Sequence, residues 1–453
     1  MWLIPAVVMA MTSGLVAPAA DATGPALNWR ACGGLGAECA ELAVPLDWSR
    51  PAGDRITVAV SRLKAADPAR RIGVLFFNPG GPGNAARPEV RDQGDQVFPA
   101  ELRDRFDIVG VDPRGVGDSK PAISCEKSTV DPAGTRYPST RAQFDHLAAY
   151  NREVAESCRR ATGPLIDHVD TVSAAKDFDV VRSALGEQQV SWLGLSYGTL
   201  LAATYAHLFP LQVRAAVLDG PEDHTIGSRR FAADEAAATE KVFGAFADWC
   251  QSDPACALHG RDVQAEYRAL LDRAPLPAAG FPDGASVEQI GFGTYSKLMF
   301  RSEWPALAKD IADAATNAAA FAAEAPTDPA YRVIACHDMP TGEVTYPEFA
   351  DRVTEIRKLA PTTQGYVEGW DVQAGCLGWP IKPANPWGSV RVRGVPRTLV
   401  VAGTLDPATP HSWGPLVAAQ IHGSKLLTWT EPGHTAYLND PETRHVIVDY
   451  LLG

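Results

Sequence analysis

The chain has 453 residues, of which 46% are hydrophobic and 21% are charged, so it can bury a large core and has the composition of an ordinary globular protein. Its 54 acidic residues outnumber its 41 basic residues, and the net charge of -13 argues against nucleic acid or an anionic membrane surface as a partner.

Residues 1–22 have the pattern of a signal peptide. An apolar run over residues 2–16 is followed by small residues that fit a cleavage site, Ala17, Ala19, Ala20 and Ala22. The run is too short and too interrupted to predict a membrane span, and the first basic residue is Arg30, so a basic flank is missing. We therefore expect a secreted protein without a stable membrane anchor.

The eight cysteines suit export to an oxidising compartment. None of them has CxxC spacing and no histidine cluster accompanies them, so we expect neither a metal site nor another cofactor. The simplest arrangement is a set of four disulfides, although the sequence alone leaves the connectivity open. The expected pairs are Cys32 with Cys39, Cys125 with Cys158, Cys250 with Cys256, and Cys336 with Cys376.

Short apolar runs predict the strands of a sheet. An antiparallel pair over residues 41–48 and 55–63, joined by a turn at 51–54, comes first. Buried parallel strands are then predicted over 73–77, 106–111, 189–195, 213–218, 398–402 and 425–429, with helices over 174–185, 199–209 and 443–452. The alternation predicts an α/β fold: a mostly parallel sheet with helices on both faces.

The strand pattern stops between residues 218 and 398. The patterns there are mostly helical, including an Ala-rich helix expected over 312–325. We interpret residues 221–385 as a helical cap inserted after the sixth strand, with the core formed by residues 23–220 and 386–453. Such a cap would cover the carboxyl ends of the strands, where open α/β sheets bind ligands.

Residues 194–198 carry the pattern G-x-S-x-G between a predicted strand and a predicted helix. This context is typical of a nucleophile elbow, in which Ser196 is held at the tip of a sharp turn and at the amino end of a helix. The two glycines are needed because a Cβ at either position would clash in so tight a turn. The alternative is a glycine-rich connection in which Ser196 only caps the helix.

A nucleophilic serine needs a base, an acid and an oxyanion hole. His434, which follows the last predicted strand, is the candidate base, and Asp406, which follows the strand before it, is the candidate acid. Asp219 competes with Asp406, because some hydrolases take the acid from the end of the preceding strand. The oxyanion donors would be the N–H groups of Tyr197 and Gly81, with Gly80 as the alternative to Gly81.

Several motifs together resemble the secreted actinobacterial tripeptidyl aminopeptidases, relatives of the proline iminopeptidases within the α/β-hydrolases. They are Asn-Pro-Gly-Gly-Pro-Gly at 78–83, Val-Asp-Pro-Arg-Gly-Val-Gly-Asp-Ser at 111–119, the elbow, Gly-Thr-Leu-Asp-Pro at 403–407 and Gly-His at 433–434. The similarity runs from about Leu42 to the end of the chain, and Cys336 and Cys376 look like that family's cysteines at the border of the cap. Pro79 replaces the histidine of the proline iminopeptidase loop, which favours the tripeptidyl branch.

The resemblance implies the α/β-hydrolase fold and a monomeric serine exopeptidase that releases short peptides from free N-termini. An aminopeptidase must bind an ammonium group, for which Glu222, Asp223 and Asp338 are candidates, although all three could be solvated surface acids. The substrate would be a peptide or a small ester, since some relatives are known mainly as esterases. A proline iminopeptidase-like exopeptidase and a non-catalytic binding protein are the further alternatives.

Overall fold

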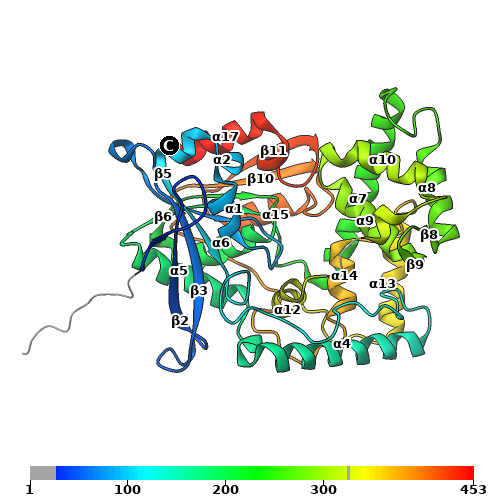
Figure 1. Cartoon of the computed structure of the whole chain (residues 1–453), viewed down its shortest axis with the longest axis horizontal. Coiled ribbons are helices and arrows are strands. Elements are labelled where there is room, and N and C mark those ends of the chain that lie inside the picture. Colours follow the sequence, from blue (N-terminus) through cyan, green and yellow to red (C-terminus); the bar gives the residue numbers. More distant parts are fainter. Residues whose placement is uncertain (1–26, 324–326) are drawn as a thin grey trace, which may run out of the picture.

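The computed structural model describes residues 27–323 and 327–453, so the predicted signal peptide lies outside the described residues. Its centre is a nine-stranded sheet with the strand order β1-β2-β3-β5-β4-β6-β7-β10-β11 (Figure 1). The strands are β1 (Arg30–Ala31), β2 (Glu38–Pro45), β3 (Arg55–Leu63), β4 (Gly73–Asn78), β5 (Phe106–Asp112), β6 (Val190–Leu195), β7 (Val213–Asp219), β10 (Thr398–Leu405) and β11 (Lys425–Pro432).

The sheet confirms the predicted strands. β2 and β3 pair in antiparallel register, as expected for the first two predicted strands, and β3 pairs in the same sense with β5. All pairs from β5 to β11 are parallel, so the carboxyl ends of these strands lie at one edge. The loops that leave this edge carry all of the candidate catalytic residues.

Alternate residues of the central strands feed two separate cores, because successive side chains of a strand point to opposite faces. In β4, Val74 and Phe76 join the core on one face, whereas Leu75 and Phe77 join the core on the other. The first face packs against α5 (Thr171–Ala184), α6 (Tyr197–Leu208) and α15 (Trp413–Gln420). The second packs against α1 (Ala86–Asp92), α3 (Ala100–Arg105), α16 (Ala436–Asn439) and α17 (Pro441–Leu452). The short helix α2 (Gly94–Val97) joins α1 to α3.

Between β7 and β10 the chain is mostly helical, and we call residues 227–375 the helical segment. Figure 1 shows most of it beside the sheet, with α4 (Arg141–Thr162) running under both. Accordingly, Val154 of α4 joins a core of the sheet and Phe144 joins the core of the helical segment. The helices of the segment are α7 (Gly227–Ser252), α8 (Val263–Arg273), α9 (Val287–Leu298), α10 (Trp304–Asp313), α11 (Ala319–Ala322), α12 (Pro329–Asp338), α13 (Tyr346–Leu359) and α14 (Glu368–Gly375).

Two details of the helical segment differ from expectation. The Ala-rich stretch is not one helix over 312–325, because α10 ends at Asp313, a turn follows, and only Ala319–Ala322 is helical again within the described residues. The Thr316 and Asn317 N–H groups both donate to the Asp313 carbonyl, which closes that turn. A two-stranded sheet, β8 (Leu276–Ala278) with β9 (Phe281–Ala285), was also not predicted.

The structure pairs all eight cysteines as the sequence suggested. The disulfides are Cys32–Cys39, Cys125–Cys158, Cys250–Cys256 and Cys336–Cys376. The last one joins α12 to the residue that follows α14. In the described parts of the chain, no helix is long and apolar enough to cross a membrane, and no cluster of side chains suited to a metal ion is found.

Candidate active site

Ser196 lies in a strained turn between β6 and α6. Its backbone has φ 54° and ψ -128°, a region that L-residues other than glycine rarely adopt and that often marks functional sites. A Cβ on Gly194 would lie 2.3 Å from the Gly198 carbonyl oxygen. A Cβ on Gly198 would lie 2.6 Å from the backbone carbonyl oxygen of Asn78. These contacts agree with the steric reason for both glycines of the motif, and they place Ser196 at the amino end of α6.

The glycine-rich loop after β4 lies directly against this turn. A Cβ on Gly80 would come within 2.9 Å of the Ser196 Cβ, so only glycine lets the loop approach so closely. Gly81 lines the same pocket as Ser196. Tyr197 is the first residue of α6, so its N–H has no carbonyl partner within the helix. The expected oxyanion donors Gly81 and Tyr197 therefore lie on the two segments that flank the serine.

His434 and Asp406 face each other across the loops that follow β10 and β11. The His434 Nδ1 atom lies 3.0 Å from both carboxylate oxygens of Asp406. Asp406 is 2% exposed, and its carboxylate also accepts hydrogen bonds from the Ala408 and Thr409 N–H groups and the Thr409 hydroxyl. Burial disfavours the imidazolium, but the adjacent Asp406 carboxylate outweighs this effect and the pKa of His434 is raised. Because a carboxylate can only accept hydrogen bonds, Nδ1 is the donor to Asp406, and Nε2 is the imidazole nitrogen that can accept a proton.

The competing acid, Asp219, occupies a different position. Both of its carboxylate oxygens accept hydrogen bonds from backbone N–H groups, those of Ala436 and Tyr437. Asp219 thus forms hydrogen bonds with the backbone that follows His434, whereas Asp406 forms them with the His434 imidazole.

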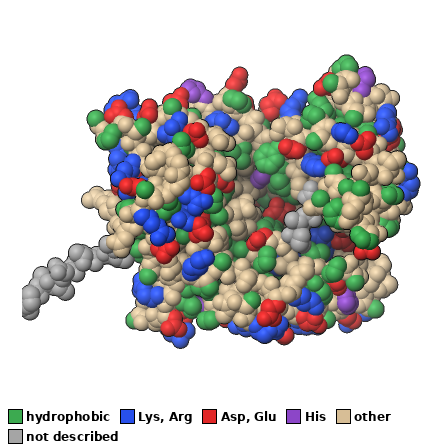
Figure 2. Space-filling view, in the orientation of Figure 1, with side chains coloured by type: hydrophobic (Ala, Val, Ile, Leu, Met, Phe, Trp, Pro, Cys, Tyr) green, Lys and Arg blue, Asp and Glu red, His purple; other side chains and the backbone are tan. Residues whose placement is uncertain are grey.

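Among the described residues, three glutamates line the pocket that contains Ser196 and Gly81. They are Glu222 from the loop after β7, Glu235 from α7 and Glu368 from the start of α14. The apolar part of the wall comes from Phe231, Met339, Ala408 and Trp413, and no lysine or arginine is among the described residues that line it. Figure 2 shows the molecule hollowed between the sheet and the helical segment, with acidic, histidine and hydrophobic side chains inside the hollow.

Burial disfavours the ionised form of these three carboxylates. It raises the pKa of Glu222 and of Glu235 well above the usual value, and the nearby Glu368 raises both further. It also raises the pKa of Glu368, which the Tyr331 hydroxyl opposes by donating a hydrogen bond at 2.6 Å. The Glu222 Oε1 atom is buried and has no hydrogen-bond partner among the described residues. A group of acids of this kind is suited to a cationic ligand, which would stabilise their charged forms.

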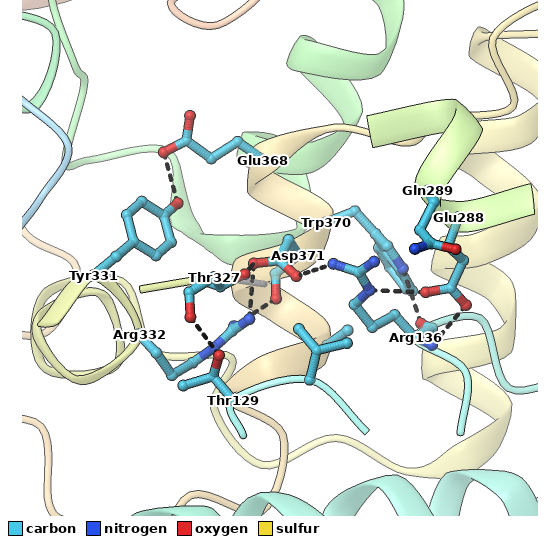
Figure 3. Close-up of polar contacts among 12 residues, drawn as sticks. Thr129, Arg136, Glu288, Gln289, Thr327, Tyr331, Arg332, Glu368, Trp370 and Asp371 are labelled. Carbon is cyan, nitrogen blue, oxygen red and sulfur yellow. Dashed lines mark hydrogen bonds and ion pairs between the residues drawn. The ribbon is translucent and has the colours of Figure 1, made fainter. Parts of the chain in front are cut away.

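A buried ion-pair network fixes α14, which carries Glu368. Figure 3 shows the Tyr331 ring directed at Glu368, with Asp371 held between two arginines further along α14. Arg332 and Arg136 approach the Asp371 carboxylate at 2.7 and 2.6 Å, and they lower the pKa of Asp371 although burial opposes them. Arg136 also binds Glu288 of α9 at 2.8 Å. The network thereby ties α12, α14 and α9 together behind the pocket.

Asp338 is not among the pocket-lining residues. Its carboxylate is fully buried and accepts hydrogen bonds from the Thr171 N–H and hydroxyl, the Asn385 amide and the Tyr197 hydroxyl. Its oxygens are therefore taken up by neutral donors, and its contacts give no support to the prediction that it binds an ammonium group. Asp223, the other alternative, accepts hydrogen bonds from Thr225 and Gln420.

Sequence reasoning did not find Glu235 and Glu368. Glu235 was detectable, because it falls on the buried stripe of α7 with Phe231, Ala232, Ala236 and Thr239, where a charged residue is unusual. Glu368 has no such signal, since it stands at the first position of α14, where an acid is favoured by the helix dipole alone.

The chain is similar to known proteins over most of its length. The family model of the alpha/beta hydrolase fold matches residues 73–441. The chain is 30% identical over 449 residues to serine protease Hip1 from Mycobacterium tuberculosis (strain CDC 1551 / Oshkosh), covering 92% of this chain and 85% of that protein. It is 30% identical to the tripeptidyl aminopeptidase of Streptomyces lividans, covering 93% and 83%, and 30% identical to carboxylesterase B of Mycobacterium tuberculosis (strain ATCC 25618 / H37Rv), covering 95% and 89%.

Proposed function

Because the chain belongs to the α/β-hydrolase family, in the branch of the actinobacterial serine peptidases, we propose that it is a secreted aminopeptidase that releases short peptides, tripeptides among them, from free N-termini. Ser196 is the proposed nucleophile, His434 the base and Asp406 the acid that orients it. The chain would act as a monomer.

The observation that carries this proposal is the acidic pocket beside Ser196. Glu222, Glu235 and Glu368 line one pocket with the proposed nucleophile, and burial raises the pKa of each. The ammonium group of a peptide N-terminus would supply the missing positive charge and form charge-assisted hydrogen bonds with these acids. A neutral ester offers no such group, so the pocket favours an exopeptidase.

Each residue of the proposed site has a separate role in the proposed reaction. The Ser196 Oγ attacks the peptide carbonyl while the His434 Nε2 takes its proton. The N–H groups of Tyr197 and Gly81 stabilise the oxyanion. His434 returns the proton to the leaving amine, and water activated by the same histidine hydrolyses the acyl-enzyme. Asp406 holds the imidazole and stabilises its cation throughout.

The test uses a mixed pool of peptides with free and acetylated N-termini, and mass spectrometry of the products. We expect short N-terminal fragments from the free peptides and little cleavage of the acetylated ones. Ser196→Ala should retain only the residual rate enhancement of about 10³–10⁴ over water that positioning and the oxyanion hole provide. Cleavage by Ser196→Ala at the parent rate would refute the proposed nucleophile.

Carboxylesterase activity is the second candidate, because the proposed triad also hydrolyses esters and one similar protein is named carboxylesterase B. The same peptide pool separates the two candidates. No peptide cleavage, together with equal hydrolysis of an ester of a peptide with a free and with an acetylated N-terminus, would favour the esterase. Failure of a fluorophosphonate to label Ser196 would favour a non-catalytic binding protein.

A further inference from the structure

Asp219 is a buried acid to which the proposed reaction gives no role. It is the last residue of β7 and is 1% exposed. Its backbone carbonyl accepts a hydrogen bond from the Ser196 N–H at 2.9 Å. Its carboxylate accepts hydrogen bonds from the N–H groups of Ala436 at 3.1 Å and Tyr437 at 2.7 Å. One residue therefore joins the serine turn to the histidine loop, as we call residues 433–437.

The histidine loop needs such support because its backbone is strained. Thr435, directly after His434, has φ 63°, which is a rare conformation for a β-branched residue. The Asn439 amide donates to the carbonyl oxygens of His434 and Thr435 at 2.6 and 3.0 Å. Asp219 accepts from the two residues that follow Thr435. The strained residue is thus held on both sides, and if it relaxed, the His434 ring would move with it.

The position of Asp219 also couples this loop to the serine. Gly220, the next residue, is so close to the histidine loop that a Cβ there would lie 3.2 Å from the His434 Cε1 and 3.1 Å from the Thr435 Cγ2. The end of β7 therefore contacts the proposed base, and it holds the proposed nucleophile through the Ser196 N–H. A displacement of the carboxyl end of β7 would therefore change the distance between Ser196 and His434.

We propose that Asp219 is a positioning residue that fixes His434 relative to Ser196 by bonding the strained histidine loop to the end of β7. The inference rests on the proposed function, because it takes Ser196 as nucleophile and His434 as base. It differs from a role as triad acid, since the carboxylate forms its hydrogen bonds with backbone N–H groups and not with the imidazole, on which only its charge acts, by raising the pKa of His434.

The primary test is Asp219→Asn, assayed with a small neutral ester and calibrated by fluorophosphonate titration of the active sites. The amide keeps the size of the side chain but presents an NH₂ group to one of the two N–H donors. We expect kcat per titrated site to fall about 10–100-fold, as for a misplacement of about 1 Å, with KM within about 2-fold of the parent. The rate of Ser196 labelling should fall by a similar factor.

Asp107→Asn is the matched control. Asp107 is also a buried strand carboxylate that accepts a backbone N–H, that of Ala65, and it forms an ion pair with Arg71 as well. It lies near the amino end of β5, away from the ends of the strands that carry the proposed site. Its replacement should lower the yield or the stability and leave kcat per titrated site unchanged. Asp406→Asn, in contrast, should lose about 10⁴ in kcat because the tautomer of His434 is no longer fixed.

Rescue gives the sharpest distinction between positioning and acid catalysis. Thr435→Gly removes the strain, because glycine adopts this φ without cost. Added to Asp219→Asn, it should recover a large part of the lost kcat, whereas it should not rescue Asp406→Asn. If Asp219→Asn does not fold, Asp219→Ser carries the test, since one hydroxyl cannot replace the two carboxylate oxygens that accept from the Ala436 and Tyr437 N–H groups, and it should also lower kcat.

The outcomes separate this inference from the proposed function. If Ser196→Ala is inactive while Asp219→Asn, or in its place Asp219→Ser, keeps the parent kcat per titrated site, the role of Asp219 is refuted and the proposed function stands. If Ser196→Ala keeps the parent activity, the proposed function fails first. A loss in Asp219→Asn that equals that of Asp406→Asn and resists Thr435→Gly would make Asp219 an acid of the reaction and overturn the positioning role.

Discussion

Replacement of Glu222 should affect the hydrolysis of peptides with free N-termini more than the hydrolysis of neutral esters. The Glu222 backbone N–H donates to Thr199, whose hydroxyl in turn donates to the Ser196 carbonyl, so the position of Glu222 is coupled to the serine turn. Loss of a charged hydrogen bond to an ammonium group costs about 1.5–3 kcal/mol. Glu222→Gln should therefore lower kcat/KM about 10–100-fold for peptides with free N-termini, and leave that for neutral esters within about 2-fold. Steady-state kinetics on both substrate classes measures the difference.

The control for Glu222→Gln is Asp223→Asn. Asp223 is buried beside Glu222, and its Oδ2 also has no hydrogen-bond partner among the described residues, but its Oδ1 accepts from Thr225 and Gln420 and it does not line the pocket. Its replacement should not discriminate between the two substrate classes. An equal loss on peptides and esters in Glu222→Gln would contradict the role of Glu222 in ammonium binding.

Residues with a local motif were predictable from the sequence, and residues without one were not. Ser196 and Asp406 follow the apolar runs of β6 and β10, and His434 follows the shorter apolar run of β11, so the parallel topology places all three at the same edge of the sheet. Glu368 comes to the pocket through the packing of α12 and α14, which connects residues far apart in the chain. No local pattern encodes such a contact.

At the scale of elements, α12 links three parts of the proposed site. Near its start, a Cβ on Gly83 of the glycine-rich loop would lie 2.8 Å from the Tyr331 nitrogen, and the Tyr331 hydroxyl donates to Glu368. At its end, Asp338 accepts a hydrogen bond from the Tyr197 hydroxyl at 3.2 Å. The Cys336–Cys376 disulfide joins α12 to the end of α14. The helix thus orients the acidic pocket relative to the oxyanion loop.

Tyr331→Phe tests this link. Without the hydroxyl, the pKa of Glu368 should rise further, because the hydrogen bond that opposes burial is gone. At neutral pH we expect kcat/KM for peptides with free N-termini to fall about 3–10-fold, in keeping with one hydrogen bond of about 1 kcal/mol, and to recover as pH rises. Tyr295→Phe is the matched control, since its hydroxyl lies 3.4 Å from Glu368 and should matter less. A larger effect from Tyr295 would refute the assignment.

The buried strands could be predicted from the sequence, whereas two short strands and the break in the Ala-rich stretch could not. Buried strands are recognisable because both faces must be apolar, as in the fully buried β4 and β6. β8 and β9 escaped prediction because they are short, mostly exposed and contain Pro277 and Pro282, which weaken any strand pattern. The Ala-rich stretch was expected to be one helix because alanine has a high helix propensity. The turn closed by the Asp313 carbonyl overrides that propensity.

For the whole molecule, buried acids should place the stability maximum at mildly acidic pH. Burial raises the pKa of Asp219 and Glu89 to about 7 and that of Asp338 to about 6, from usual values near 4. The folded chain therefore binds these protons more tightly than the unfolded chain, and the free energy of unfolding should fall as pH rises from about 4 to about 7. Below about pH 4 the sign reverses, because paired surface acids such as Asp67, whose pKa Arg70 lowers, lose their stabilising charge.

Urea unfolding with the disulfides intact, from pH 3 to pH 8, measures this curve. We expect a maximum near pH 4–5 and a lower free energy of unfolding at pH 8 than at pH 5.

Glu89→Gln provides a matched comparison outside the proposed machinery. Burial alone raises the pKa of Glu89, so its replacement should make the free energy of unfolding fall less steeply as pH rises. Burial also raises the pKa of the pocket acids Glu222, Glu235 and Glu368, so these acids too destabilise the empty protein as pH rises, and a bound cationic ligand should stabilise it most at pH 7–8. A stability that increased steadily from pH 5 to pH 8 would contradict this account.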